Sequence, residues 1–253
     1  MGERTRSAVL EMFYGYFGSF RAGTMADIFS KNVSESVAPE RSLEGKVIIL
    51  DFPYHTHRTV GAFAQILYKR AWQNAMQRRN IDENNRPVFL WIDEYQIFAD
   101  PDDQEFCTTA RSNRVAPVFL TQNISNLYAA IGDENRVISM LGNLVTKIFH
   151  QNGDYKTNEY AVSVIAKTRR KKMVGDRRKQ EVQQFEEKII EQIIPHDFTL
   201  LESGGKSNDY YVEAIMTGDT YYAQTESGET KKQNYMRANF RQRFHSSEKQ
   251  QQP

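Results

Sequence analysis

Residues 88–94 read Val-Phe-Leu-Trp-Ile-Asp-Glu, a short apolar run that ends in two carboxylates. A continuous apolar run of this length is typical of a strand buried on both faces, as in a parallel sheet. The polar stretch Asn84–Pro87 precedes it and indicates a turn. We therefore predict a strand over Val88–Ile92 whose carboxyl end presents Asp93 and Glu94.

Similar apolar runs recur on both sides of this strand, and stretches of helical periodicity separate them. The other predicted strands are Lys46–Phe52, Pro117–Thr121 and Val145–His150. The predicted helices are Thr59–Arg79, Asp102–Arg111, Ile124–Ile131, Asn135–Leu141 and Thr157–Ala166. The first of these helices has a predicted buried face made of Val60, Phe63, Ala64, Leu67, Ala71 and Ala75. Strand and helix in alternation predict an α/β fold, with a mostly parallel sheet and helices on both of its faces.

The character of the chain changes after Ala166. Lys167–Lys179 holds eight basic residues, and we expect a basic loop there. The charged stretch Glu181–Ile194 predicts a helix, and Tyr210–Met216 a late strand. We divide the chain into a core over residues 1–166, a basic loop with a charged helix over 167–194, a closing segment over 195–245 and a disordered tail over 246–253.

Composition excludes several classes of protein. The chain has 253 residues, of which 40% are hydrophobic, and its 33 basic against 32 acidic residues leave a net charge of +1. This balance excludes a protein that coats DNA through a basic surface all round. A single cysteine, Cys107, excludes an intramolecular disulfide framework and a cysteine-rich zinc module. No apolar run approaches the roughly 20 residues of a membrane span, and no signal peptide is recognisable, so we expect a soluble, cytoplasmic chain.

The carboxylates after the first strand suggest a site. At the carboxyl edge of a parallel sheet, where such folds bind ligands, Asp93 and Glu94 match the Walker B pattern of nucleotide hydrolases. An acidic start to a helix explains the pair equally well. Gln122 follows the next strand at the same edge, where an amide can sense a phosphate or orient a water molecule. A lone glutamine at this position is more often a capping residue, but the two signals together are more specific.

Three stretches carry a resemblance to a known family: WIDEYQIF at residues 91–98, TTARSNRVAPVFLTQNISNL at 108–127 and NLVTKIFHQNGDYKTNEYAVSVIA at 143–166. In order and spacing they resemble the motor domain of TraG/TraD-type conjugative coupling proteins. These are RecA-like ATPases of type IV secretion, related to the FtsK/HerA translocases. PERSLEGKVIILDFP before these stretches and IIPHDFTLLESGGKSNDYYVEAI after them extend the resemblance to roughly residues 24–242.

The resemblance implies roles for particular residues. Asp93 would hold Mg²⁺ through water, Glu94 would activate the attacking water, and Gln122 would sense the γ-phosphate of ATP. Arg111 and Arg114 would reach the nucleotide of a neighbouring subunit, although a solvated helix end explains them as well. The implied partners are single-stranded DNA or a relaxase complex, other coupling-protein subunits in a hexamer, TraM and inner-membrane secretion components. The implied location is the cytoplasm, or the cytoplasmic face of the inner membrane through these partners.

The chain departs from the family in one motif. The P-loop pattern GxxxxGK[ST] is absent, and the Gly45-Lys46 pair is followed by Val47 and lacks the earlier glycine. By this resemblance we expect the chain to correspond to the C-terminal portion of the motor. The resemblance leaves three alternatives: a fragment, a half that joins a separate P-loop-bearing half, or a degenerate homologue. We predict no ATPase activity for the chain alone, and the alternative function is a non-enzymatic assembly or DNA-docking module.

The basic stretch offers a candidate for DNA contact. Arg169, Arg170, Lys171 and Lys172 could neutralise backbone phosphates without reading sequence. A solvated, charge-rich loop is the slightly favoured alternative. No third ligand at a recognisable spacing accompanies His55 and His57, so a metal site there is not predicted.

Overall fold

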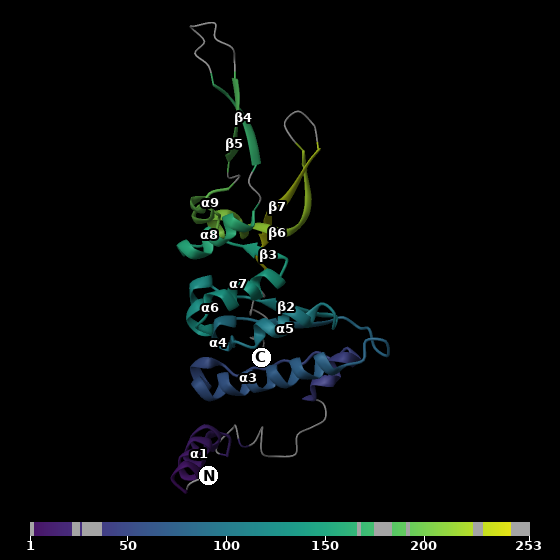
Figure 1. The fold of residues 1–253 in the computed structure, drawn as a ribbon, viewed down its shortest axis with the longest axis vertical. Helices are drawn as coiled ribbons and strands as arrows, with labels where there is room; N and C mark the ends of the chain where they lie inside the picture. Colours follow the sequence, from purple (N-terminus) through teal and green to yellow (C-terminus); the bar gives the residue numbers. More distant parts are fainter. Residues whose placement is uncertain are drawn as a thin grey trace, which may run out of the picture. The chain divides into compact units, whose positions relative to one another are not determined.

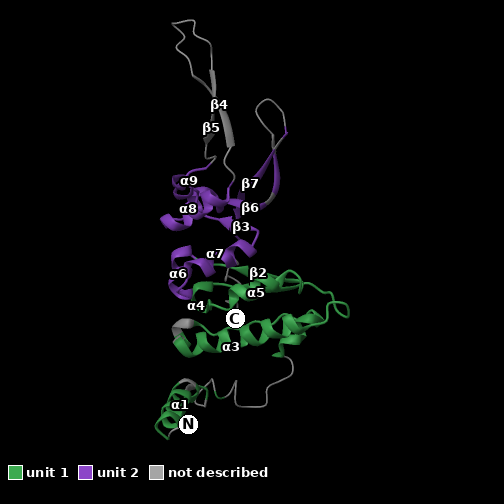
Figure 2. Ribbon diagram, in the orientation of Figure 1, with its two compact units in different colours: residues 1–121 green, residues 122–253 purple. Residues whose placement is uncertain are grey.

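The computed structural model describes residues 3–21, 26, 37–165, 168–174, 184–190, 193–224 and 230–243. The chain forms two compact units, residues 1–121 and residues 122–253 (Figure 2). The predicted tail from Ser246 lies outside the described residues. None of the helices in the described ranges combines the length and apolar content that a bilayer crossing requires.

The first unit consists of helices around a short parallel sheet (Figure 1). In chain order its elements are α1 (Glu3–Phe17), η1 (Gly18–Arg21), η3 (Pro39–Glu44), α3 (Tyr54–Arg78), β1 (Val88–Ile92), α4 (Tyr95–Phe98), α5 (Asp103–Ala110) and β2 (Val115–Phe119). β1 and β2 pair in parallel over their whole length, with Val88 opposite Val115 and Ile92 opposite Phe119. The predicted strand Val88–Ile92 is confirmed, as is its parallel pairing with the next strand.

The predicted strand Lys46–Phe52 is wrong. The segment is extended but pairs with no strand of the described residues, and Val47 and Ile49 are 85% and 81% exposed. Its apolar sequence predicts burial, but a strand forms only where a partner offers hydrogen bonds. The part of the chain that the structure describes provides none for this segment.

Helix α3 is confirmed, and so is the burial of Ala64 with partly buried Val60 and Phe63 beside it, but further along the helix the buried face differs from the predicted one. Leu67 and Ala71 are exposed, whereas Lys69, Trp72, Gln73 and Met76 are buried. These four positions follow the i, i+3, i+4, i+7 spacing of one helix face. Two of them are polar, and their burial depends on a network with α5, alongside which α3 runs in Figure 1.

The second unit combines helices with an antiparallel sheet. Its elements are α6 (Ile124–Ile131), α7 (Glu134–Asn143), β3 (Lys147–Phe149), α8 (Tyr155–Val164), β4 (Thr168–Val174), β5 (Gln184–Ile190), α9 (Pro195–Thr199), η4 (Lys206–Asn208), β6 (Tyr211–Gln224) and β7 (Thr230–Arg241). Asn123 caps α6, Asp133 caps α7 and Asp154 caps α8, because each side chain accepts a bond from a free N–H of the first turn. β3 confirms the strand predicted in Val145–His150, but it pairs antiparallel with β6 and not with β1 or β2.

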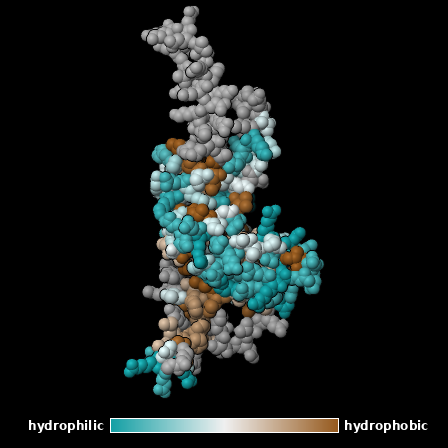
Figure 3. Space-filling view, in the orientation of Figure 1, coloured by the Kyte–Doolittle hydropathy of each residue, from teal (hydrophilic) through white to brown (hydrophobic). Residues whose placement is uncertain are grey.

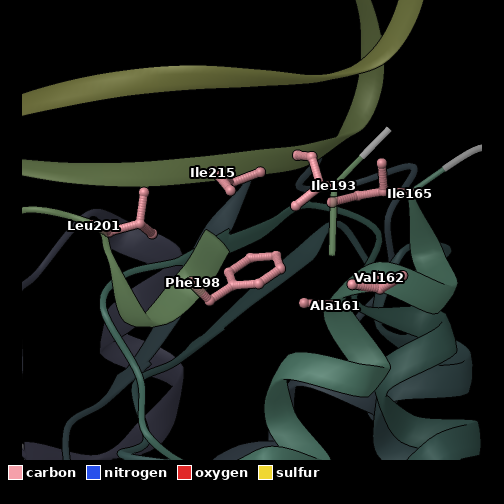
Figure 4. Close-up of a cluster of buried hydrophobic side chains, with 7 residues drawn as sticks. All are labelled: Ala161, Val162, Ile165, Ile193, Phe198, Leu201 and Ile215. Carbon is pink, nitrogen blue, oxygen red and sulfur yellow. The ribbon is translucent and has the colours of Figure 1, made fainter. Parts of the chain in front are cut away.

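A hydrophobic cluster holds the second unit together. Figure 4 shows Phe198 of α9 lying between Ile215 of β6 and Ala161 and Val162 of α8. Phe198, Ala161 and Ile215 are fully buried. The ring of Phe149 on β3 meets Phe198 edge-on at 5.8 Å, so the three-stranded sheet and the two helices share one core.

β6 and β7 change register between Thr217 and Tyr221. Gly218 lies in this irregular stretch with a φ of 112°. A Cβ atom built on Gly218 would lie 2.2 Å from the carbonyl oxygen of Val145, so the backbone of another segment occupies the space that a side chain would need.

The predicted helix Glu181–Ile194 is wrong, and so is the predicted loop over much of Lys167–Lys179. β4 and β5 form an antiparallel hairpin instead. Lys171 pairs opposite Glu187 and Lys172 opposite Glu186, so residues of opposite charge share cross-strand positions. Residues 175–183 lie outside the described part.

The α/β class is confirmed by the parallel strands and the helices around them. Much of the surface that Figure 3 shows is hydrophilic, and hydrophobic side chains gather in separate patches.

Candidate functional site

Asp93 and Glu94 follow the last residue of β1, where the strand gives way to the short helix α4. The backbone N–H of Glu94 donates to Oδ1 of Asp93 at 2.9 Å. Glu94 has φ 48° and ψ 44°, a left-handed conformation that is costly for a residue with a side chain. Strain of this kind persists only where neighbouring contacts fix the backbone, and those contacts are identifiable here.

Two ties between the ends of β1 and β2 fix the position of Glu94. The N–H of Tyr95 donates to the carbonyl of Leu120 at 2.8 Å. The Tyr95 ring, fully buried, stacks on Phe119 with ring centres 4.0 Å apart and planes within 11°. Tyr95, which follows Glu94, is therefore held against the end of β2, and Ile92, two residues before Glu94, pairs with Phe119.

The Glu94 carboxylate has a polar neighbour of its own. Nε2 of Gln96 donates to Oε2 of Glu94, and the hydroxyl of Thr121 donates to Oε1 of Gln96 at 2.7 Å. Because Thr121 engages the amide oxygen, the amide NH₂ group faces the carboxylate. Gln96 therefore links the side chain of Glu94 to the residue that follows β2.

Below this edge lies a buried ion pair. Lys69 of α3 and Asp103 of α5, 4% and 0% exposed, are joined by Nζ and Oδ2 at 2.5 Å. The Tyr95 hydroxyl donates to the same Oδ2 at 2.8 Å, and Nε2 of Gln73 donates to Oδ1 at 2.8 Å. Burial, with the negative charge of Asp103 beside it, raises the pKa of the Tyr95 hydroxyl above its ordinary range. The hydroxyl therefore stays protonated and acts as a donor, which fixes Tyr95 from below.

A groove of about 1040 Å³ lies along β1. Its lining includes Lys46–Pro53, Val88–Glu94 and four residues of α3, so Asp93 and Glu94 open into it. The α3 residues are Gln65, Tyr68, Lys69 and Trp72. Asp51 lines the same groove, as do Phe89 and Trp91. The carboxylates thus lie at one end of a groove whose walls are largely apolar.

Gln122, the third predicted residue, begins the second unit. Its side chain is exposed, and its backbone carbonyl accepts a bond from Nδ2 of Asn152 at 2.7 Å. Gln122 is one residue beyond Thr121, which contacts Gln96. Its predicted role stays a prediction.

Arg111 and Arg114 lie at the opposite end of the parallel strands. Both are exposed, and Nη1 of Arg114 donates to the carbonyl of Asn85, ahead of β1. β1 has five residues, so these arginines are separated from Asp93 by roughly the 16 Å that such a strand spans. The structure does not bring them to the Asp93–Glu94 edge of their own chain.

The basic candidates lie on β4. By register Arg169 faces Ile189, Arg170 faces Lys188, and the two lysines face glutamates. Only Arg169 and Arg170 have no acidic residue directly across the hairpin. The predicted DNA contact of Arg169, Arg170, Lys171 and Lys172 stays a prediction.

Sequence reasoning missed Gln96, Thr121, Lys69 and Asp103. Gln96 and Thr121 could have been identified from the sequence, because each lies within two residues of a predicted site residue at the sheet edge. No sequence feature indicates the burial of Lys69 and Asp103, because a charged residue in an amphipathic helix is normally assigned to the solvated face.

Comparison with known proteins agrees with the sequence resemblance. Residues 87–198 match the family TraG-D_C, described as the TraM recognition site of TraD and TraG. The matched stretch contains β1, β2 and all three predicted edge residues. No curated protein matches the chain.

A solved structure, the bacterial conjugative coupling protein TrwBdeltaN70 in its unbound monoclinic form, is similar at 16% identity and a TM-score of 0.44. The match covers 61% of this chain and 33% of that one, so the chain matches about a third of the solved protein.

Proposed function

We propose that this chain is part of a DNA-translocating ATPase, a coupling protein that serves conjugative transfer through a type IV secretion system. The observation that carries the proposal is the placement of Asp93 and Glu94. They follow a parallel strand inside the stretch that matches the TraG/TraD family. The carboxyl ends of parallel strands are where open α/β sheets bind ligands.

Asp93 suits a magnesium ion that is held through water. Its carboxylate is exposed, and the Glu94 N–H is its hydrogen-bond partner among the described residues, so an oxygen remains accessible. Mg²⁺ usually keeps several waters and binds through one or two carboxylates together with substrate phosphates. Bound Mg²⁺ would neutralise charge on the phosphates of ATP.

Glu94 is the proposed base for the attacking water. Its carboxylate lines the groove, where it can accept a proton from a water molecule, and the bond from Gln96 to Oε2 helps to orient it. Gln122 would then contact the γ-phosphate. Arg111 and Arg114, at the other end of the strands, fit a role toward the nucleotide of a neighbouring subunit better than toward their own.

The proposed partners follow from the same assignment. They are single-stranded DNA or a relaxase complex, a TraM-type protein, further coupling-protein subunits and inner-membrane secretion components. ATP binding also needs a P-loop, and this sequence has no GxxxxGK[ST] motif. We therefore expect turnover only with a separate P-loop-bearing polypeptide.

The test is reconstitution. The purified chain is mixed with a P-loop-bearing segment of a coupling protein, and Mg²⁺-dependent ATP hydrolysis is measured. We expect activity only in the mixture, and its loss with Glu94→Gln. Glu105→Gln, an exposed carboxylate on α5, is the matched control and should leave the rate unchanged. A mixture that hydrolyses ATP equally well with Glu94→Gln contradicts the assignment.

A non-enzymatic assembly module is the second candidate. The observation that favours it is the exposed apolar wall of the groove, with Phe89 59% and Trp91 67% exposed. This reading predicts a stable complex with the partner that never hydrolyses ATP. For the DNA-docking form, neutralising Arg169 and Arg170 should flatten the salt dependence of DNA binding, and an unchanged slope removes the hairpin from consideration.

A further inference from the structure

The parallel sheet of the first unit has one bare face. Phe89 and Trp91 alternate along β1 with half-buried or buried neighbours, so both project to the same side. Val47 and Ile49 on the extended segment beside the groove are more exposed still. These four large apolar side chains are exposed and line one groove, whose lining on the other side of β1 includes Lys69 and Trp72 of α3.

The opposite face of the sheet is covered. Trp72 of α3 meets Phe106 of α5 edge-on at 6.5 Å, and Lys69 pairs with Asp103, so the two helices pack together. Val88 and Val115, which project to the side away from Phe89, are buried. Parallel sheets in soluble proteins are almost always covered by helices on both faces. The exposed apolar residues mark the face that lacks this second layer.

The two ends of the groove carry opposite charges. At one end Nδ2 of Asn84 donates to the carbonyl of Leu43 at 3.1 Å, and the Arg86 guanidinium lies against Gly45. These contacts tie the start of the extended segment to the start of β1. Both segments run from this common end, where Lys46 and Arg86 line the groove, toward Asp51, Asp93 and Glu94 at the other.

We propose that this groove docks an apolar helix of a partner polypeptide, with the helix N-terminus at the Asp51–Asp93 end. The partial positive charge of a helix N-terminus complements the three carboxylates, and the negative C-terminus complements Lys46 and Arg86. The helix then runs antiparallel to the strands, as covering helices do in parallel α/β sheets. The three carboxylates also disfavour an anionic membrane surface as the occupant. The proposal rests on the proposed function only for the identity of the partner.

A stapled helical peptide tests both the docking and its direction. About 12 residues suffice, because a helix rises about 1.5 Å per residue and β1 spans roughly 16 Å. The peptide carries one face of leucine and alanine, and it is made with a nitroxide label at either end. A control peptide has glutamine in place of leucine. Binding to the full chain is measured by titration, and orientation by broadening of backbone amide signals.

We expect the N-terminal label to broaden the signals of Asp51 and Asp93, and the C-terminal label those of Gly45 and Arg86. Trp91→Asn and Phe89→Asn should each weaken binding about tenfold or more, because aromatic anchors dominate such interfaces. Leu200→Asn, in the second unit and 64% exposed, is the matched control and should leave binding unchanged. Denaturation midpoints of all three variants show whether the fold is intact.

Equal binding of both peptides, insensitivity to Trp91→Asn, or the reverse orientation overturns the proposal. Self-association of the chain that Trp91→Asn abolishes identifies a second copy as the occupant and overturns it as well. The two proposals fail separately. If the peptide docks but the reconstituted mixture has no ATPase activity, the docking proposal is supported and the proposed function is not. If the mixture hydrolyses ATP and neither Phe89→Asn nor Trp91→Asn changes the rate or the peptide binding, only the proposed function is supported.

Discussion

The two faces of the β1–β2 sheet differ in the burial of their side chains. Helices α3 and α5 cover one face and bury a lysine, an aspartate, a tyrosine and a cysteine there. The other face exposes Phe89 and Trp91 along the same strand. One face of β1 is thus covered by helices of the same chain, whereas the other face is exposed. The difference shows that apolar sequence sets the capacity for burial, and that a covering element decides whether burial occurs.

The largest expected difference between the covered and the exposed face is in the reactivity of a thiol placed on each. Burial beside Asp103 raises the pKa of Cys107 from 9.0 to about 12, although Lys69 opposes this shift. A three-unit rise lowers the thiolate fraction about 1,000-fold. Cys107 should therefore react with Ellman's reagent at pH 8 only on unfolding, whereas a bare-face thiol in Cys107→Ala/Trp91→Cys should react at once. Equal rates for the two thiols would contradict the contrast.

The same shift has a pH signature. The folded chain holds the Cys107 proton more tightly than the unfolded chain does. Its contribution to stability is therefore complete below pH 9.0 and is lost as the pH rises toward about 12. Urea unfolding of the native chain and of Cys107→Ala between these pH values measures the difference.

Breaking the buried ion pair should produce the largest loss of stability. Asp103→Asn removes the closer counter-charge of the buried Lys69, leaves only Asp100 at 4.0 Å, and weakens the bond from Tyr95. We expect a loss of about 3–5 kcal/mol in the free energy of unfolding. The measurement is urea denaturation followed by the fluorescence of Trp72, which lies on the same helix as Lys69. Glu134→Gln, which removes the exposed partner of Lys156, should have a much smaller effect. Similar losses from both variants would show that the covered face does not depend on this pair.

Glu94, at the carboxyl end of β1, has a strained left-handed backbone conformation. At φ 48°, Glu94→Gly should be more stable than Glu94→Ala by about 1 kcal/mol, because glycine tolerates the left-handed region. Glu105 lies within α5, so the order should reverse there, with Glu105→Ala more stable than Glu105→Gly. Chemical denaturation of the four variants gives both differences. The same order at both sites would argue against strain at Glu94.

The bare face should give the smallest effect. Phe89→Thr changes a side chain that is 59% exposed, and we expect a change within about 0.5 kcal/mol. Val88→Thr, its neighbour on the covered face and 4% exposed, should cost clearly more. If Phe89→Thr proves as costly as Val88→Thr in thermal unfolding, Phe89 is covered within the chain and the groove is not open.

How much the sequence could predict differs along the chain for physical reasons. Val88–Ile92 was predictable to the residue because Pro87 and Asp93 delimit an apolar run. Lys46–Phe52 carries the same local signal, but pairing depends on a partner that a local pattern cannot supply. Gln184–Ile190 contains two glutamates and a lysine and was predicted as part of a helix, whereas its pairing with β4 makes it a strand.

The candidate site shows the same division. Asp93 and Glu94 were identified because motif and strand end coincide in the sequence. The contacts that hold Glu94, from Gln96 and Thr121, depend on side-chain directions at the ends of two strands. Lys69 could not be found, because its burial follows from the position of Asp103, 34 residues away.

Gly218 has an evolutionary consequence. Its missing side chain leaves room for the carbonyl of Val145, and its φ of 112° suits glycine alone. The constraint comes from another segment's backbone, so no change in neighbouring side chains can relieve it. Among natural variants of this chain, position 218 should accept only glycine, while exposed Tyr222, a few residues further along the same strand, is free to drift.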